Sequence, residues 1–186
     1  FSLLLIINMN CIIRIVSADD TLCTLGRLDY HSLSQQTLME MVIDGIENRE
    51  LICGSKESPK DIADWDGLTV EEKEVKKIQW YRTGITGSIH LQWLPSTVAY
   101  FSVRLNHLLG SIAWTQLPES LDLFKISQNS FTGDIDLEHL PRQMKELWAR
   151  NNRLSGTLNL DKLPQQITRL VLSNNSFSGT VSLKNL

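Results

Sequence analysis

The sequence predicts an α/β repeat solenoid, a stack of short coils that share a parallel β-sheet. Three sequence features recur every 23 positions between Val75 and the end of the chain, and a fixed period of this length is typical of solenoids. The recurring Leu-Pro pairs are Leu94-Pro95, Leu117-Pro118, Leu140-Pro141 and Leu163-Pro164, the glycines are Gly87, Gly110, Gly133, Gly156 and Gly179, and the asparagines are Asn106, Asn129, Asn152 and Asn175. We therefore expect residues 75–186 to form five stacked repeats.

Residues 1–18 are expected to be a secretory signal segment. They are strongly apolar but short for a helix that crosses a bilayer. They end in the small residues Val16-Ser17-Ala18, which are typical of a cleavage site. The segment has no initiating methionine and no basic start, so we expect its true beginning to be missing. The alternatives are an uncleaved signal anchor or a buried strand. A membrane would be reached only through such an anchor or through a segment missing from this chain.

Secretion bears on the cysteines. Cys11 would leave with the signal segment, while Cys23 and Cys53 would remain as an even pair in an oxidising compartment. The sequence predicts either a bridge between Cys23 and Cys53 or two free, buried thiols. The sequon Asn174-Asn175-Ser176 makes Asn174 a candidate for glycosylation in a secreted protein.

Residues 19–74 are expected to form an N-terminal cap with one amphipathic helix near 34–47. The apolar residues with helical spacing are Leu38, Met41, Val42 and Ile46. Ser32 or Ser34 is a suitable N-cap, whereas Gly45 weakens the prediction at the carboxyl end. The helix and Trp65 would cover the open apolar end of the solenoid, because an end repeat has no neighbour there.

Each repeat reads apolar-x-x-apolar-x-apolar-x-x-Asn-x-apolar-x-Gly-x-apolar, and the copies begin at Val75, Val98, Leu121, Met144 and Ile167. The central alternation predicts a short strand with one buried face. The asparagine follows this strand, where its side chain can bond backbone groups and form a buried polar ladder. Glycine permits a tight bend, and Leu-Pro favours an extended return. Thr83 replaces asparagine in the first repeat, as expected of an atypical terminal unit.

Charge divides the chain at about the same place. Residues 19–74 carry 14 acidic and 5 basic residues, a net charge of −9, whereas residues 75–186 carry 7 acidic and 12 basic residues, a net charge of +5. With Arg14, the whole chain has a net charge of −3. The acidic cap and the basic repeats are therefore distinct in chemistry.

No catalytic pattern emerges, and we expect no enzyme. The sequence has no Gly-x-Ser-x-Gly, Gly-Lys-Ser/Thr or His-Glu-x-x-His pattern. The histidines, which are His31, His90, His107 and His139, fall in different units without a shared pattern of partners. No cysteine-histidine cluster suggests a metal, no cofactor motif occurs, and no nucleic-acid-binding signature is present.

The repeat pattern resembles the leucine-rich repeat proteins over residues 75–186. The segments FTGDI at 131–135, LSGTL at 154–158 and FSGTV at 177–181 resemble the extracellular repeats of plant receptor ectodomains, and the connection IDLEHLP at 135–141 resembles surface repeat proteins of kinetoplastid protists. Trp65-x-Gly67-x-Thr69-Val70 is similar to the Trp-x-Gly-Val-Thr-Cys start of plant-type caps, but Val70 replaces the cysteine and excludes the usual cap disulfide. The resemblance implies a right-handed curved stack with a parallel sheet on its concave side and a convex side of short turns, extended connections and single 3₁₀ turns.

Strand positions that alternate with buried ones should face solvent on the inner side of the sheet. These positions form three columns: Lys77, Tyr100, Leu123, Glu146 and Arg169; Gln79, Ser102, Lys125, Trp148 and Val171; and Tyr81, Arg104, Ser127, Arg150 and Ser173. Arg82 lies beside them. Their basic and aromatic members, which we call the inner strip, are Lys77, Tyr81, Arg82, Tyr100, Arg104, Lys125, Trp148, Arg150 and Arg169. Only one acidic residue, Glu146, shares these columns.

Arginine and aromatic side chains are enriched at binding hot spots. We therefore expect the inner strip to bind an acidic protein or an anionic glycan, although exposed strand positions also tolerate random polar residues. The acidic cap of a neighbouring molecule is a further candidate partner. The sequence thus predicts a secreted or surface-displayed, non-enzymatic interaction module, cut within a repeat at Leu186. The alternatives are an ectodomain fragment of a leucine-rich-repeat receptor kinase, or a decaying gene copy.

Overall fold

The computed structural model describes residues 30–179 and 181, and the chain divides into two compact units, residues 1–33 and 34–186. The described part of the first unit contains the 3₁₀ turn η1 (Tyr30–Ser32). The predicted signal segment, Cys11 and Cys23 lie outside the described residues. The second unit contains the cap helix and all of the repeats.

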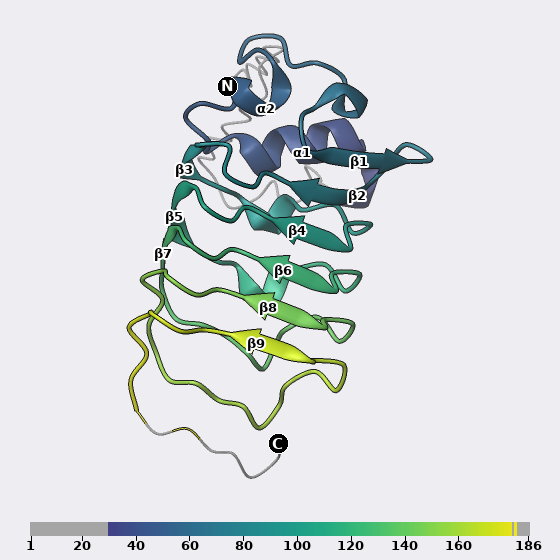
Figure 1. Ribbon diagram of the computed structural model, residues 1–186. Coiled ribbons are helices and arrows are strands. Elements are labelled where there is room, and N and C mark those ends of the chain that lie inside the picture. Colours follow the sequence, from purple (N-terminus) through teal and green to yellow (C-terminus); the bar gives the residue numbers. More distant parts are fainter. Residues whose placement is uncertain (1–29, 180, 182–186) are drawn as a thin grey trace, which may run out of the picture. The chain divides into compact units, whose positions relative to one another are not determined.

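The second unit is a parallel β-solenoid, as the sequence predicts (Figure 1). Its main sheet contains β1 (Leu68–Glu71), β2 (Glu74–Gln79), β4 (Tyr100–Ser102), β6 (Leu123–Lys125), β8 (Glu146–Trp148) and β9 (Arg169–Val171), in that order. The strands from β2 onward are parallel, and each pairs with the next at a constant step of one repeat, so that Lys77 lies beside Tyr100 and Glu146 beside Arg169.

A second parallel sheet forms where extended connections were expected. It contains β3 (Thr86–Ser88), β5 (His107–Ser111) and β7 (Ser130–Thr132). These strands begin soon after the asparagine of each coil, and neighbouring coils are close enough there to pair backbone with backbone. The expected single 3₁₀ turns follow as η3 (Leu91–Trp93) and η4 (Trp114–Gln116), and the prediction of a mostly non-helical convex side is confirmed.

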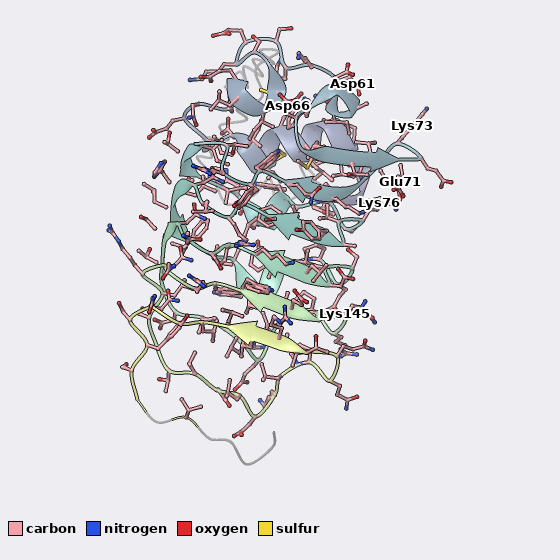
Figure 2. The ribbon with its side chains drawn as sticks, in the orientation of Figure 1. Asp61, Asp66, Glu71, Lys73, Lys76 and Lys145 are labelled. Carbon is pink, nitrogen blue, oxygen red and sulfur yellow. The ribbon has the colours of Figure 1, made fainter. Side chains whose placement is uncertain are left out.

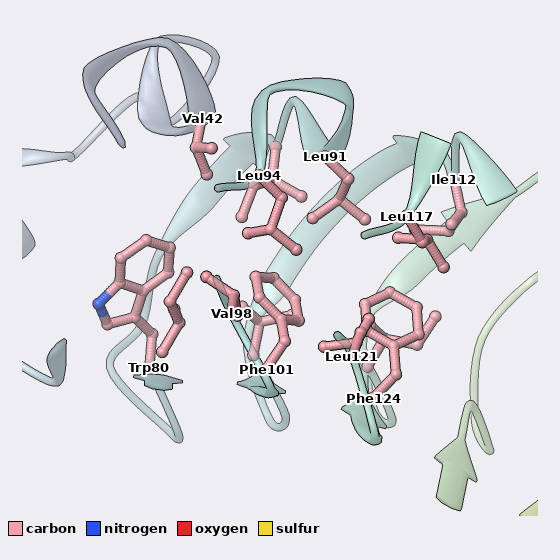
Figure 3. Packing of buried hydrophobic residues seen from close by; sticks show 14 of the residues in the cluster. Val42, Trp80, Leu91, Leu94, Val98, Phe101, Ile112, Leu117, Leu121 and Phe124 are labelled. Carbon is pink, nitrogen blue, oxygen red and sulfur yellow. The ribbon is translucent and has the colours of Figure 1, made fainter. Parts of the chain in front are cut away.

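The core lies between these elements and is filled by the apolar positions of successive coils (Figure 3). Trp80, Phe101 and Phe124 are almost fully buried. The rings of Phe101 and Phe124 have their centroids 5.4 Å apart, and Trp114 meets Phe124 edge-on at 6.1 Å. Fully burying an aromatic or branched apolar side chain contributes about 1.5–3 kcal/mol, so each coil is stabilised chiefly by its neighbours.

The asparagines form a ladder along the stack. In each coil from the second onward, the asparagine Nδ2 donates to a carbonyl oxygen of its own coil and to one of the preceding coil. For Asn152 these are Ala149 at 3.1 Å and Ile126 at 3.0 Å. Its Oδ1 accepts from the backbone N–H of Phe131 at 3.1 Å. The amide therefore satisfies backbone groups of two coils at once, which a hydrophobic residue at this position could not do.

The cap contains α1 (Gln35–Ile43), α2 (Glu50–Cys53) and the 3₁₀ turn η2 (Ile62–Asp64). Ser34 is the N-cap of α1, and its hydroxyl accepts from the N–H of Thr37 at 3.1 Å. The helix ends at Ile43, earlier than its apolar spacing suggests, because the chain then runs against β3. There the carbonyl of Gly45 accepts from the N–H of Ser88 at 2.8 Å, and a Cβ on Gly45 would lie 2.4 Å from the Ser88 hydroxyl.

A β-hairpin separates the cap from the first coil. β1 pairs with β2 in the antiparallel sense, and the turn between them places Glu72 and Lys73 at positive φ, 51° and 65°. Figure 2 shows Glu71, Lys73 and Lys76 at the projecting end of this hairpin. Three acidic residues, Glu71, Glu72 and Glu74, belong to this hairpin. Strand β1 covers the edge of β2, which would otherwise be open to unwanted pairing.

Candidate functional site

The inner strip extends along the exposed face of the main sheet. Lys77 is on β2, Tyr100 on β4, Lys125 on β6, Trp148 on β8 and Arg169 on β9. The other four members, Tyr81, Arg82, Arg104 and Arg150, follow the ends of strands. Strand register brings these residues together across five coils, since every strand from β2 to β9 is in step with the next.

Trp148 is the centre of this surface. Three cationic groups lie over its indole ring: the guanidinium of Arg169 at 5.3 Å, the ammonium of Lys125 at 5.6 Å and the guanidinium of Arg104 at 5.7 Å from a ring centroid. A cation within about 6 Å of an aromatic face is attracted by the ring quadrupole. The ring therefore holds positive groups from three different coils near one another.

Glu146 neutralises part of this charge. One carboxylate oxygen, Oε2, accepts a hydrogen bond from the indole N–H of Trp148 at 2.8 Å and lies 3.5 Å from the ammonium of Lys125. The Trp148 hydrogen bond, followed by the charge of Lys125, lowers the pKa of Glu146 below its ordinary value. The ammonium of Lys125 also lies 5.4 Å from the ring centroid of Tyr100, which fixes its position further.

Arg104 is held differently. Its guanidinium lies 5.7 Å from the ring centroid of Tyr81 and 5.7 Å from that of Trp148. Among the described residues it has no ion pair, and its Nε is buried without a hydrogen-bond partner. Arg104 therefore has a fixed aromatic setting but no acceptor for its N–H donors.

Two positions of the predicted columns are not exposed. Ser102 is 4 % exposed and Ser127 is 1 % exposed, so the expectation that both face solvent is wrong. Ser127 is a short side chain between Arg104 and Arg150 in its column, and the guanidinium of Arg104 lies 5.7 Å from the ring centroid of Trp148, in the coil that follows that of Ser127. The Ser127 hydroxyl is buried without a hydrogen-bond partner among the described residues.

Sequence reasoning missed one periodic feature at the margin of the strip. The residue before each ladder position has a left-handed backbone: φ is 53° at Arg82, 59° at Leu105, 60° at Gln128, 55° at Asn151 and 58° at Asn174. Asparagine adopts this conformation readily, whereas leucine does so at a cost. The asparagines at two of these positions were a sequence signal for this turn. The turn directs the chain away from the sheet, so Arg82 lies just outside the three columns.

The other predicted modification sites can be placed only in part. Cys53 is fully buried and has no disulfide partner among the described residues; its Sγ lies 3.2 Å from the carbonyl oxygens of Arg49 and Ser55. Burial raises its pKa. Because Cys23 lies outside the described residues, the bridge remains a prediction. Asn174 is exposed and donates from Nδ2 to Asn151 Oδ1 at 2.6 Å.

A cavity of about 660 Å³ in the cap is a poorer candidate. Two of its polar lining groups already have structural roles: Gln35 Oε1 accepts from the N–H of Val75 at 3.0 Å, and Gln36 Oε1 accepts from the N–H of Ile62 at 2.8 Å. The first bond joins the cap to the first coil and the second joins α1 to η2, so these two amide oxygens offer a ligand little further hydrogen-bonding capacity.

Within residues 30–179 and 181, no helix has the length and apolar character needed to cross a bilayer. In the same part of the chain, no three histidine, cysteine or acidic side chains gather in a way that would hold a metal ion.

Comparison with known proteins identifies the fold. No protein-family model and no curated protein sequence matches the chain. Among solved structures it is similar to the BIR2 ectodomain from Arabidopsis thaliana, with 20 % identity, 80 % of this chain and 83 % of that chain covered, and a TM-score of 0.67. It is also similar to the leucine-rich-repeat ectodomain of the receptor kinase SOBIR1 from the same plant, with 22 % identity, 78 % and 82 % covered, and a TM-score of 0.60.

A third similar structure contains a ligand. It is the ectodomain of the Arabidopsis receptor kinase HAESA in complex with the peptide hormone IDA, with 17 % identity and a TM-score of 0.60. The match covers 77 % of this chain and 29 % of that chain. The chain therefore has the leucine-rich-repeat fold of the extracellular type, as its sequence pattern suggested.

Proposed function

We propose that this chain is a secreted or surface-displayed, non-enzymatic interaction module that binds an acidic segment of another protein on the inner strip. The observation that carries the proposal is the set of three cationic groups over the one ring of Trp148. Like charges repel, and the repulsion between neighbouring cations falls when an anion binds between them. Glu146 is the one acidic residue in the strip's columns, so the surface has a surplus of positive charge.

The composition of the strip favours a protein ligand over a purely electrostatic partner. Tyr81 is 53 % exposed, and Trp148 and Tyr100 are partly exposed beside the cations. Aromatic and arginine side chains together are typical of protein-binding hot spots. The HAESA ectodomain, which shares the fold, is known in complex with a peptide hormone. These points support an extended acidic peptide segment as the ligand class.

Binding should be measured with the full chain and short peptides whose termini are acetylated and amidated, so that only side chains carry charge. One peptide contains glutamates among apolar residues, and its control has glutamine at the same positions. We expect binding of the glutamate peptide, weakening as salt rises. A heparin-derived oligosaccharide tests the glycan class. Binding of that glycan and not of the acidic peptide would overturn the choice of ligand.

Two double variants test whether the inner strip is the binding site: one reverses two charges within the strip, and the control reverses two charges outside it. Arg104→Glu with Arg150→Glu should abolish binding of the glutamate peptide. Arg142→Glu with Arg153→Glu makes the same change in net charge at exposed positions outside the strip, and should leave most of the affinity intact. If both pairs weaken binding equally, net charge alone is responsible and the strip is not the site.

Secretion is part of the proposal and has its own test. Expression of the chain from the natural start of its signal segment in eukaryotic cells should release protein that begins at Asp19. Treatment with a glycosidase should lower its mass, and the Asn174→Gln variant should show no such change. Retention of all of the protein inside the cells would contradict the extracellular assignment.

The likeness to SOBIR1 and HAESA favours a second candidate, in which this module is the ligand-binding part of a receptor kinase. The full-length transcript would show this directly as a hydrophobic span and a kinase sequence in the same reading frame. A transcript that encodes a lipid-anchor signal or a stop codon instead would favour a surface or secreted protein without a kinase.

A further inference from the structure

We infer that Arg104 is the principal anion-binding residue of the inner strip, and that Glu146 keeps Lys125 from serving the ligand. This inference rests on the proposed function, because it names the side chain that receives the negative group of the ligand. It divides the strip into an open cationic part around Arg104 and a part whose charge is already balanced.

The first support is the setting of Arg104. Two aromatic rings lie near its guanidinium, those of Tyr81 and Trp148, each with its centroid 5.7 Å from the Cζ atom. The rings restrict where the side chain can lie, so less rotamer entropy is lost when a ligand binds. The guanidinium has no carboxylate partner within the described residues.

The buried atoms next to Arg104 limit how a ligand can approach. Its Nε has almost no contact with solvent, and neither does the Ser127 hydroxyl. A ligand therefore meets the two terminal NH₂ groups rather than the Nε edge. A carboxylate can accept one hydrogen bond from each of these groups in a single plane, which is the geometry that arginine favours.

The second support is that the ammonium of Lys125 is already paired with Glu146. Its side chain is only 17 % exposed, and that of Glu146 is 23 % exposed. The ammonium of Lys125 lies between the Tyr100 and Trp148 rings and is 3.5 Å from Glu146 Oε2. The indole N–H of Trp148 holds the same oxygen at 2.8 Å. A ligand carboxylate at Lys125 would have to displace Glu146 and leave its charge beside the ligand.

Taken together, these contacts specify the ligand as a side-chain carboxylate of an extended peptide that binds over β4 and β6, with its neighbouring residues near Tyr81. Arg150 is exposed, lies two coils from Arg104 in the same column, and has no ion-pair partner among the described residues. It would provide long-range attraction for a second acidic residue. Glu146 would then disfavour acidic residues at the β8 end of the strip.

The experiment compares two variants with the amide-capped glutamate peptide. Arg104→Lys keeps the charge but removes the planar pair of donors, and should weaken binding by roughly tenfold or more, since hydrogen bonds to charged groups contribute about 1.5–3 kcal/mol. Lys125→Met combined with Glu146→Gln removes a balanced ion pair and should weaken binding much less than Arg104→Lys does, because the Lys125 charge is already paired. Thermal unfolding of each variant shows whether the fold is retained.

The outcomes separate this inference from the proposed function. If Arg104→Lys binds as tightly as the unaltered chain, Arg104 is not the anchor, even though the acidic peptide binds to the strip. A large loss in the double variant would likewise show that Lys125 serves the ligand. Failure of the unaltered chain to bind any acidic peptide would overturn the proposed function itself. Glu146→Gln alone offers one more check, because it should broaden binding to peptides with acidic residues at the β8 end.

Discussion

The side-chain amide of Asn129 donates a hydrogen bond to the carbonyl oxygen of Val103, in the preceding coil, at a distance of 2.8 Å. The same nitrogen lies 3.1 Å from the carbonyl of Ile126 in its own coil, and the amide oxygen accepts from the N–H of Leu108. One side chain thus supplies bonds that two coils would otherwise lack. The coils of this solenoid are joined by polar groups at their turns as well as by apolar packing.

Replacing Asn129 should therefore destabilise the fold strongly. Asn129→Ala leaves backbone groups of two coils unpaired, and each buried unpaired group costs about 1–3 kcal/mol, so we expect a loss of roughly 3 kcal/mol or more in the free energy of unfolding. Urea unfolding at neutral pH measures this. The matched change Asn159→Ala, at an exposed loop position, should cost far less, and equal losses would contradict the role assigned to the ladder.

Substitution of Gly45 and of Gly84 should destabilise the fold for different reasons. A Cβ on Gly45 would lie 2.8 Å from the Ser88 carbonyl oxygen, whereas a Cβ on Gly84 meets nothing within 4 Å but the backbone has φ of 76°. Asparagine tolerates such a backbone. We expect Gly84→Asn to be milder than Gly84→Ala, and Gly45→Asn to be at least as harmful as Gly45→Ala. Thermal unfolding of the four variants provides the comparison, and the same order at both sites would refute it.

The contact between Glu146 and Trp148 should appear in the pH dependence of stability. Because the folded protein lowers the pKa of Glu146, its contribution is present above the pKa of the unfolded chain. It is lost as pH falls through the lower, folded pKa. The Trp148→Phe variant keeps a ring but removes the N–H donor, so the folded pKa of Glu146 should rise toward its ordinary value. The contribution of Glu146 should then be smaller, and its loss should be complete at a higher pH. Chemical denaturation at a series of acidic pH values tests this, with Glu146→Gln as the variant in which the dependence disappears.

Cys53 should be almost unreactive in the folded protein. Its thiol is fully buried and its pKa is raised by burial, so little thiolate is available to an alkylating reagent. In a Cys11→Ser, Cys23→Ser background, we expect alkylation at neutral pH to be slow until denaturant unfolds the chain. Rapid alkylation without denaturant would show that the cap opens easily.

The predicted bridge between Cys23 and Cys53 needs a separate measurement. Protein secreted with all of its mature cysteines should be analysed by mass spectrometry with and without reductant. A bridge lowers the mass by two hydrogen atoms and yields a linked peptide after proteolysis. Two alkylated cysteines in the unreduced protein would instead show free thiols.

The sequence predicted the parts of the fold that repeat. The constant spacing of its repeats determines which residues are neighbours in the sheet, and so Lys77, Tyr100 and Glu146 could be assigned to one column from the sequence alone. The ladder position could be recognised because one asparagine serves the same turn in every coil from the second onward. Both features depend only on spacing along the chain.

Contacts between side chains at different repeat positions could not be predicted from the spacing. Ser127 is 1 % exposed although its column position predicts exposure, and Arg104 of the preceding coil lies near Trp148 of the following one. The helix α1 ends early because Gly45 meets Ser88, which belongs to the distant strand β3. Periodicity carries no information on either contact, since each involves the length or absence of a particular side chain.

The contact of Arg104 with Trp148 joins coils that are not adjacent in the stack. In a solenoid each coil otherwise meets only its immediate neighbours, so segments can loosen one after another from an end. A ligand held by Arg104 would tighten a span of three coils as a single block, and amide protons within that block would exchange with solvent more slowly in concert. Occupancy of this surface would thereby be communicated along the axis as a change in local rigidity, without any rearrangement of the backbone.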